Sequence, residues 1–313
     1  MIYSVIIPVF KNEVSIPQLL QTLTVMNQAL NGQMEAVFVV DGSPDRSYAL
    51  LHEALASLNF SAQLLAHSRN FGAFAAIRSG LKAAQGKYFG VMAADLQEPS
   101  DLVLAFFEAL AKNECDVAIG TRSGRNDPLF SRFASKLFWG LYRRLVVPDM
   151  PAGGVDIFGC NRQFRDQLLQ LEESRSSLIA LIFWLGFRRK LVGYERQERQ
   201  QGKSAWTLRK KIDYMMDSIF SFTDYPIRLL TRVGAVGSFL SIIFAVLILS
   251  ARMLGKIEVP GYTATTLIVL VLGSLNLFGL GLIGTYAWRA YENSKQRPQA
   301  IVALMHKNEW RTN

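Results

Sequence analysis

The sequence predicts an α/β protein with a mainly parallel β-sheet flanked by helices, followed by two membrane-spanning helices. Three observations predict this architecture. Strand-like and helix-like runs alternate from Val5 to Thr121. Two long stretches near the C-terminus contain no charged residue. Hydrophobic residues make up 50% of the 313 residues, which is high for a soluble enzyme.

Five short apolar runs are expected to form strands, and four helix-like runs lie between them. The expected strands are 5–9, 36–40, 63–67, 88–93 and 117–121, and the expected helices are 15–28, 47–58, 73–84 and 100–112. Alternation at this spacing favours βαβ units and a mainly parallel sheet. Such sheets bind ligands beyond the carboxyl ends of their strands, so the residues that follow each strand are the candidates for a site.

Two stretches near the C-terminus are long enough to cross a bilayer. Residues 233–251 and 259–288 carry no charge over 19 and 30 residues, and a membrane helix needs about 20 apolar residues. The alternative, two buried core helices, would need a very large soluble core. The chain start lacks a basic leader and is broken by Pro8, so it does not resemble a signal peptide. Basic residues flank the outer ends of the two stretches, which predicts a cytoplasmic catalytic domain and cytoplasmic termini.

The charge balance indicates anionic partners. The net charge is +9, from 34 Lys and Arg against 25 Asp and Glu. Nucleic acid is one partner of a basic chain, but the apolar stretches favour anionic lipid and phosphorylated substrates. Segments 129–146 and 207–222 are basic and amphipathic; the second is expected to lie in the membrane interface, and the first there or on the sheet. Cys115 and Cys160 have no metal-ligand spacing and are expected to be reduced.

Polar residues after the strands carry the candidate chemistry. Asp41 could accept hydrogen bonds from a base or ribose, although an Asx turn or a helix cap explains it equally well. Arg69 and Asn70 open a helix, where an anion binds well, with a plain cap as the alternative. Asp95 and Gln97 offer oxygen ligands for Mg²⁺ or Mn²⁺. The histidines have no ligand spacing, and the fingerprints of dinucleotide-binding folds and P-loop NTPases are absent.

Five segments occur in order along the chain: "SVIIPVFKNEVSI", "VFVVDGSPDRS", "HSRNFGAFAAIRSGLKAAQGKYFGVMAADLQEPSD", "GTRSGR" and "ERQQGKSAW". In this order they resemble the family-2 glycosyltransferases of the polyprenyl-phosphate type, among them bactoprenol glucosyltransferases and dolichol-phosphate mannosyltransferases. The resemblance covers residues 2–228, and "RNFG" followed by "ADLQ-x-P" is its most specific part. It implies a GT-A nucleotide-sugar-binding fold.

The resemblance and the apolar stretches together predict four parts of the chain. These are a GT-A domain over 1–206, a juxtamembrane amphipathic helix over 207–228, a two-helix transmembrane hairpin over 229–289 and a cytoplasmic tail over 290–313.

The resemblance also implies roles for individual residues. Donor-binding residues are Pro8, Glu13, Asp41, Arg69, Asn70, Asp95 and Gln97, and the last two also bind a Mg²⁺ or Mn²⁺ ion. Phosphate- and acceptor-binding residues are Arg122, Arg199 and Lys203, and the catalytic residues are Asp95, Asp156 and Arg122.

Two departures from the family pattern concern its acidic pairs. The family often has D-x-D where this chain has Ala93-Ala94-Asp95, and paired aspartates where it has Val40-Asp41. A Mg²⁺ ion held by substrate phosphates needs only one or two protein carboxylates. Asp95 with Gln97 is therefore still expected to be the ligand set.

The implied reaction is the inverting transfer of a sugar from a nucleotide diphosphate sugar to a polyprenyl phosphate, at the cytoplasmic face of a bacterial inner membrane. UDP is preferred over GDP on resemblance to the bactoprenol branch, and the sugar is left open. A phosphate monoester has its second pKa near ~6, so the acceptor needs cations more than a general base. A catalytically silent scaffold is the rival prediction, motivated by Ala93 and Val40. A processive polysaccharide synthase is disfavoured because the Q-x-x-R-W motif is absent. Small residues in the apolar stretches are compatible with a homo-oligomer.

Overall fold

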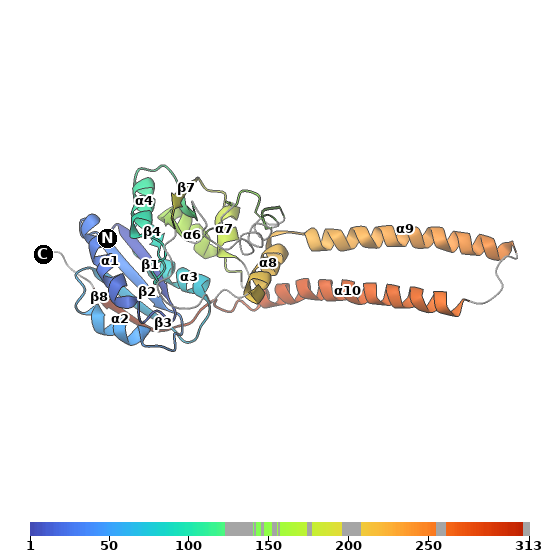
Figure 1. The fold of residues 1–313 in the computed structure, drawn as a ribbon, viewed down its shortest axis with the longest axis horizontal. Coiled ribbons are helices and arrows are strands. Elements are labelled where there is room, and N and C mark those ends of the chain that lie inside the picture. The colour runs from blue at the N-terminus through green and yellow to red at the C-terminus, as the bar shows by residue number, and fades with distance from the viewer. Residues whose placement is uncertain are drawn as a thin grey trace. The chain divides into compact units, whose positions relative to one another are not determined.

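The computed structural model describes residues 1–122, 140, 142–144, 147–151, 155, 157–173, 177–195, 208–254 and 261–308 (Figure 1). The chain forms two compact units. The first contains residues 1–211 and 297–313, and the second contains residues 212–296. In sequence, the second unit is therefore inserted into the C-terminal part of the first.

The first unit alternates strands and helices over its N-terminal half. The strands are β1 (Tyr3–Val9), β2 (Met34–Val40), β3 (Ser61–His67), β4 (Tyr88–Val91), β5 (Val117–Arg122), β6 (Phe158–Asn161), β7 (Arg189–Tyr194) and β8 (Val302–Asn308). The helices are α1 (Ile16–Ala29), α2 (Ser47–Leu55), α3 (Ala73–Ala83), α4 (Ser100–Ala111), α6 (Arg162–Gln170) and α7 (Leu178–Trp184). All nine elements predicted before residue 122 are present, with ends within three residues of their expected positions.

The eight strands form one sheet in the order β7-β5-β6-β4-β1-β2-β3-β8. Strands β1 to β5 and β7 run in one direction, whereas β6 and β8 run antiparallel to their neighbours. The prediction of a mainly parallel α/β sheet is therefore confirmed. The strand order reverses between β1 and β4, and open α/β sheets bind their ligands beyond the carboxyl ends of the strands at such a point.

Helices pack on both faces of this sheet. A Cβ atom on Gly80 of α3 would lie 2.4 Å from the side chain of Ile6 in β1, and one on Gly90 of β4 would lie 2.8 Å from Val103 of α4. Ile6 pairs with Val91, the residue after Gly90, so Ile6 and Gly90 face opposite sides of the sheet. Helices α3 and α4 therefore cover opposite faces.

Strand β2 is buried along its whole length, which is typical of a central parallel strand. Its one charged residue, Glu35, is 2% exposed. The Glu35 carboxylate accepts hydrogen bonds from Ser4 Oγ at 2.6 Å, Gln63 Nε2 at 3.0 Å and the backbone N of Gly86 at 3.3 Å. A buried carboxylate needs such donors. This cluster joins β1, β2 and β3 at the amino end of the sheet.

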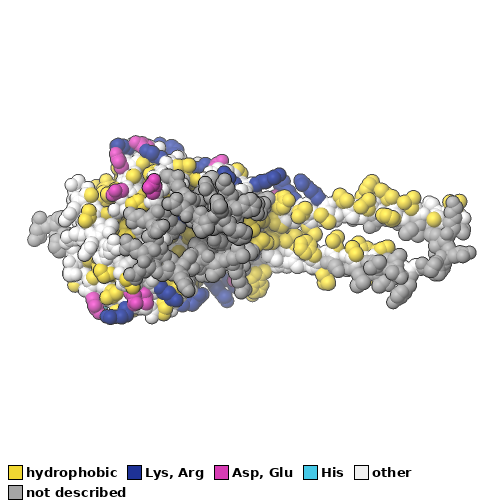
Figure 2. All heavy atoms as spheres, viewed as in Figure 1, with side chains coloured by type: hydrophobic (Ala, Val, Ile, Leu, Met, Phe, Trp, Pro, Cys, Tyr) yellow, Lys and Arg dark blue, Asp and Glu magenta, His cyan; other side chains and the backbone are white. Residues whose placement is uncertain are grey.

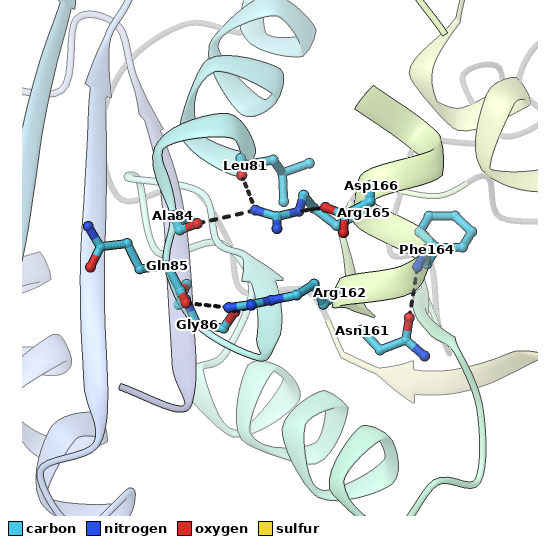
Figure 3. A network of polar contacts seen from close by, with 10 residues as sticks. Leu81, Ala84, Gln85, Gly86, Asn161, Arg162, Phe164, Arg165 and Asp166 are labelled. Atoms are coloured by element: carbon cyan, nitrogen blue, oxygen red, sulfur yellow. Dashed lines mark hydrogen bonds and ion pairs between the residues drawn. The ribbon is translucent and has the colours of Figure 1, made fainter. Parts of the chain in front are cut away.

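Two arginines of α6 bind the C-terminal end of α3 and the connection that follows it (Figure 3). Arg162 Nη2 donates to the carbonyl oxygens of Gln85 at 2.7 Å and Gly86 at 2.8 Å, and Arg165 Nη1 donates to that of Leu81 at 3.0 Å. The last carbonyl groups of a helix lack partners within the helix, and cations are favoured at that end. These arginines therefore fix α6 against the α3–β4 connection.

The C-terminal segment returns to the sheet as β8, antiparallel to β3. Residues 290–313 are predicted from the sequence to be a cytoplasmic tail, and this strand was not expected there. Asn308 Nδ2 donates to the carbonyl oxygen of Leu55 at 2.7 Å, and the His306 ring packs edge-on against His52 of α2. The chain that leaves the second unit after residue 296 therefore leads into a strand of the first.

The second unit consists of most of α8 (Leu208–Phe222), with α9 (Tyr225–Met253) and α10 (Tyr262–Ser294). Arg289 of α10 donates to Asp217 of α8 at 2.6 Å, and the rings of Phe220 and Tyr286 meet edge-on. Large apolar side chains are exposed along α9 and α10, as Figure 2 shows.

Among the described residues, one helical stretch, Val271–Ser294, is long and apolar enough to cross a membrane by length and composition. The two spans expected at 233–251 and 259–288 fall mostly within α9 and α10, and the pair stays a prediction. The amphipathic helix predicted over 207–222 coincides with α8. Most of segment 129–146 lies outside the described residues.

Candidate functional site

The carboxyl ends of β1 to β5 bring most of the candidate residues to one edge of the sheet. Arg122 ends β5, Asp95 and Gln97 follow β4, Pro8 and Glu13 lie near the end of β1, Asp41 follows β2, and Arg69 and Asn70 follow β3. Neighbouring strands lie about 4.8 Å apart. The residues therefore line this edge in the order of the strands in the sheet, on both sides of the reversal between β4 and β1.

Asp41 is 2% exposed and organises the loop that follows β3. Its Oδ1 accepts from His67 Nδ1 at 2.8 Å and from the backbone N of Phe71 at 2.8 Å, and its Oδ2 accepts from the backbone N of Gly72 at 2.7 Å. Its carbonyl oxygen accepts from Asn70 Nδ2 at 3.1 Å. Burial favours a higher pKa for Asp41, but the hydrogen bonds from His67, Phe71 and Gly72 outweigh it and lower the pKa. Asp41 is therefore ionised at neutral pH.

The turn at Gly42 lets the loop after β3 contact the end of β2 closely. Gly42 has φ +57°, and a Cβ atom there would lie 2.3 Å from the carbonyl carbon of Arg69 and 2.4 Å from the backbone N of Asn70. A glycine satisfies both the left-handed backbone and the missing space. The Arg69 guanidinium lies over the Phe71 ring, 4.0 Å from its centroid. Arg69 and Asn70 are exposed, so the loop presents a cation and an amide just before α3.

Asp45 joins the loops that follow β1 and β2. Its carboxylate accepts from Ser43 Oγ at 2.5 Å, Ser47 Oγ at 2.9 Å and the backbone N of Glu13 at 3.1 Å. Burial favours a higher pKa for Asp45, but hydrogen bonds from Ser43 and Ser47 outweigh it and lower the pKa. In return, the Glu13 carboxylate accepts from the backbone N of Arg46 at 2.9 Å. The two loops therefore form one hydrogen-bonded platform.

The turn after β4 holds Asp95 and Gln97 on either side of Leu96. Leu96 has φ 55°, a left-handed conformation that costs a non-glycine residue about 1–2 kcal/mol. Asp95 Oδ1 accepts from the backbone N of Gln97 at 3.4 Å, and both side chains are half-buried. Strained backbone of this kind is concentrated at functional sites. The next residue, Glu98, is buried, with 4% of its surface exposed.

Four predicted site residues remain, and the structure describes one of them, Arg122. Arg122 is half-buried at the end of β5. Asp156, Arg199 and Lys203 lie outside the described residues. In the part of the chain that the structure describes, no three or more His, Cys, Asp or Glu residues form a group that could hold a metal ion. The ligand set predicted from sequence, one carboxylate and one amide, is smaller than such a group.

Sequence reasoning missed His67 and Asp45. Val40 of β2 pairs in parallel with Ala66 of β3, so the next residues, Asp41 and His67, fall opposite each other. This register is a property of the folded sheet, and the sequence alone does not indicate it. The Asp45 contacts join two loops and depend on side-chain geometry that no spacing rule captures.

Comparison with known proteins identifies relatives along nearly the whole chain. Residues 4–171 match the family model described as glycosyl transferase family 2. The chain is 30% identical over 301 residues to the uncharacterized glycosyltransferase YkcC of Bacillus subtilis (strain 168), covering 96% of this chain and 93% of the relative. It is 31% identical to the uncharacterized glycosyltransferase sll0501 of Synechocystis sp., covering 96% and 94%. It is 28% identical to the prophage bactoprenol glucosyl transferase homolog of Escherichia coli (strain K12), covering 97% and 99%.

Proposed function

Because the chain belongs to glycosyltransferase family 2, we propose that this glycosyltransferase moves a sugar from a nucleotide diphosphate sugar to a polyprenyl phosphate. The observation that carries the proposal is the row of candidate residues along the carboxyl edge of β1 to β5. The relative named for bactoprenol matches 97% of the chain and supports a polyprenyl acceptor. A UDP-sugar is the preferred donor, by resemblance to that branch of the family.

The donor is proposed to lie across the strand-order reversal. Pro8, Glu13 and Asp41 belong to the nucleoside end, over β1 and β2, where hydrogen bonds already fix the loops. Asp95 and Arg122 belong to the diphosphate end, over β4 and β5. Such preorganisation favours binding because fewer groups must be ordered when the ligand arrives.

Asp95 and Gln97 fit a Mg²⁺ or Mn²⁺ ion by their chemistry. Both cations prefer carboxylate and amide oxygens, and an ion that also binds substrate phosphates needs few protein ligands. When bound, the ion would offset the charge that develops on the departing diphosphate. Ala93 stands where the family often has a second acid, so we expect weaker metal binding than in a relative that keeps the pair.

The acceptor needs little chemical activation. A phosphate monoester has a second pKa near ~6, so its oxygen is anionic at neutral pH. That oxygen attacks the anomeric carbon opposite the leaving group, a new C–O bond forms as the bond to the diphosphate breaks, and the configuration inverts. No proton has to be removed, so the protein supplies cations and positioning. Arg122, Arg199 and Lys203 are proposed to balance the phosphate charges, and Asp156 to position the acceptor.

The acceptor also accounts for the second unit. A polyprenyl phosphate keeps its headgroup at the membrane surface, so its transferase must work there. The candidate span Val271–Ser294 and the amphipathic helix α8 support a membrane location. We propose a bacterial inner-membrane protein with two spans and with its catalytic domain and both termini in the cytoplasm.

A transfer assay on the full-length protein in detergent tests the proposal. Undecaprenyl phosphate is supplied with a panel of UDP- and GDP-sugars, and glycolipid is detected by mass spectrometry. One UDP-sugar is expected to give a polyprenyl-phosphate sugar of inverted anomeric configuration. Absence of product with every donor, in protein shown to be folded, would instead favour the silent scaffold.

A further inference from the structure

A partly buried chain of hydrogen bonds runs from α3 to the loop that precedes it. Ser79 Oγ lies 2.8 Å from His67 Nε2, and His67 Nδ1 lies 2.8 Å from Asp41 Oδ1. The side chains of His67 and Asp41 are 0% and 3% exposed. Asp41 continues the chain to the backbone N of Phe71 and of Gly72. None of the assigned donor, acceptor or metal roles uses His67 or Ser79.

The charge state of Asp41 fixes the direction of its bond with His67. Asp41 is a carboxylate and can only accept, so His67 Nδ1 donates to it. The other ring nitrogen, Nε2, is hydrogen-bonded to the Ser79 hydroxyl. These two contacts fix the His67 ring at both nitrogens, and together with the loop amides they hold Asp41 in a single orientation.

The same residue types form the triads of hydrolases, but the placement here differs. Ser79 lies six residues after Ala73, the first residue of α3, and its hydroxyl contacts the buried His67 ring. The loop that the chain holds, in contrast, lies at the carboxyl edge of the sheet and presents Arg69 and Asn70 to solvent. The geometry thus favours support of the loop over nucleophilic chemistry at Ser79.

We infer that His67, held by Ser79, is a positioning residue that fixes Asp41 and through it the Arg69–Asn70 loop for binding of the nucleotide-sugar donor. The inference rests on the proposed function for the identity of the ligand. It does not need that function for the ordering of the loop, which is measurable without substrate.

Three substitutions remove one or both of the hydrogen bonds of the His67 ring and should raise the donor KM to different extents. His67→Phe keeps an aromatic ring but removes both hydrogen bonds and leaves a buried carboxylate with one donor fewer. We expect the donor KM to rise about 10- to 100-fold, with the acceptor KM changed by less than about 3-fold. His67→Asn can still donate to Asp41 and is expected to recover most of the loss. Ser79→Ala removes only the distal bond and is expected to raise the donor KM about 2- to 5-fold.

The experiment pairs hydrogen–deuterium exchange of residues 68–72 with steady-state kinetics for both substrates. The full-length protein is compared with His67→Phe, His67→Asn and Ser79→Ala, and His52→Phe on α2 is the matched control. Faster exchange of the Phe71 and Gly72 amides, together with a selective rise in donor KM and rescue by His67→Asn, is the expected result.

Two results would overturn the inference. If the loop exchanges at the same rate in His67→Phe as in the parent protein, His67 does not hold the loop, whatever the activity of the variant. Faster exchange with an unchanged donor KM in an active enzyme would show that the loop does not serve the donor. If the parent protein transfers no sugar, the proposed function fails separately, and the exchange data alone decide whether His67 holds the loop. If His67→Phe does not fold, Ser79→Ala beside His52→Phe carries the comparison, with a rise in donor KM of about 2- to 5-fold and faster exchange of the loop as the expected result and no change in either as the result that overturns the inference.

Discussion

Substitution of Gly42 by alanine should disrupt the loop that follows β3. The added Cβ would lie 2.3 Å from the carbonyl carbon of Arg69, and ordinary contacts begin at 3.4 Å, so one backbone must move by about 3.4 − 2.3 = 1.1 Å. Such a shift would lengthen the hydrogen bonds from Phe71 and Gly72 to Asp41, now 2.8 and 2.7 Å. Hydrogen bonds to a charged group are worth about 1.5–3 kcal/mol each. The left-handed backbone at residue 42 adds about 1–2 kcal/mol.

With both hydrogen bonds lost, the expected loss for Gly42→Ala is therefore about 4–8 kcal/mol, expressed as global destabilisation or as local loss of the loop. Gly186→Ala is the matched control, because Gly186 also has a positive φ, +72°, but the nearest atom to its Cβ position, the carbonyl oxygen of Trp184, lies 3.9 Å away. Chemical unfolding in detergent measures a global loss of stability, and calorimetry with UDP measures a local loss of the loop. A Gly42→Ala protein no less stable than Gly186→Ala, and with unchanged UDP affinity, would refute the reasoning.

Three further predictions concern other parts of the first unit. Leu96→Val should lower the unfolding free energy by about 1–3 kcal/mol, because a β-branched residue tolerates positive φ poorly. Leu96→Gly should change it by less than about 1 kcal/mol. Equal effects of the two substitutions would contradict the strained turn at Leu96. Glu35→Ala should lower the free energy of unfolding by about 3–5 kcal/mol, since it leaves the buried donors of Ser4, Gln63 and Gly86 unpaired. An unfolding midpoint in urea close to that of the parent protein would argue against this role of the Glu35 cluster. The folded-state pKa of Asp45 is lowered, so its contribution to stability is present above its ordinary pKa of 3.8 and is lost as the pH falls through the folded value. The difference in stability between Asp45→Asn and the parent should therefore shrink below about pH 4, and a constant difference down to pH 2 would disprove it.

The sequence allowed prediction of the elements whose signal is local. The apolar runs that became β1 to β5 and the helices between them have both periodicity and turn residues. β8 was not predicted, because residues 302–308 follow a long apolar helix and can be recognised as a strand only when β3 offers an edge to pair with. The antiparallel position of β6 between β4 and β5 is likewise a property of the whole sheet.

The candidate site was predictable in its location but not in its internal order. Strand ends marked Asp41, Asp95 and Arg122 as neighbours on one edge. The sequence did not indicate that Asp41 would be buried and held by His67, because that pairing depends on the register of β2 and β3. The left-handed turn at Leu96 also escaped prediction, since no glycine marks it.

The most direct test of the account is transfer by an Asp95→Ala protein beside Asp101→Ala, an exposed acidic residue at the start of α4. Each protein receives undecaprenyl phosphate and the productive nucleotide sugar, with Mg²⁺, with Mn²⁺ and with EDTA. We predict that Asp95→Ala lowers kcat by about 100-fold or more, that EDTA does the same to the parent, and that Asp101→Ala stays within about 2-fold. Transfer by Asp95→Ala at the parental rate would contradict the assignment of the turn after β4 to the diphosphate of the donor.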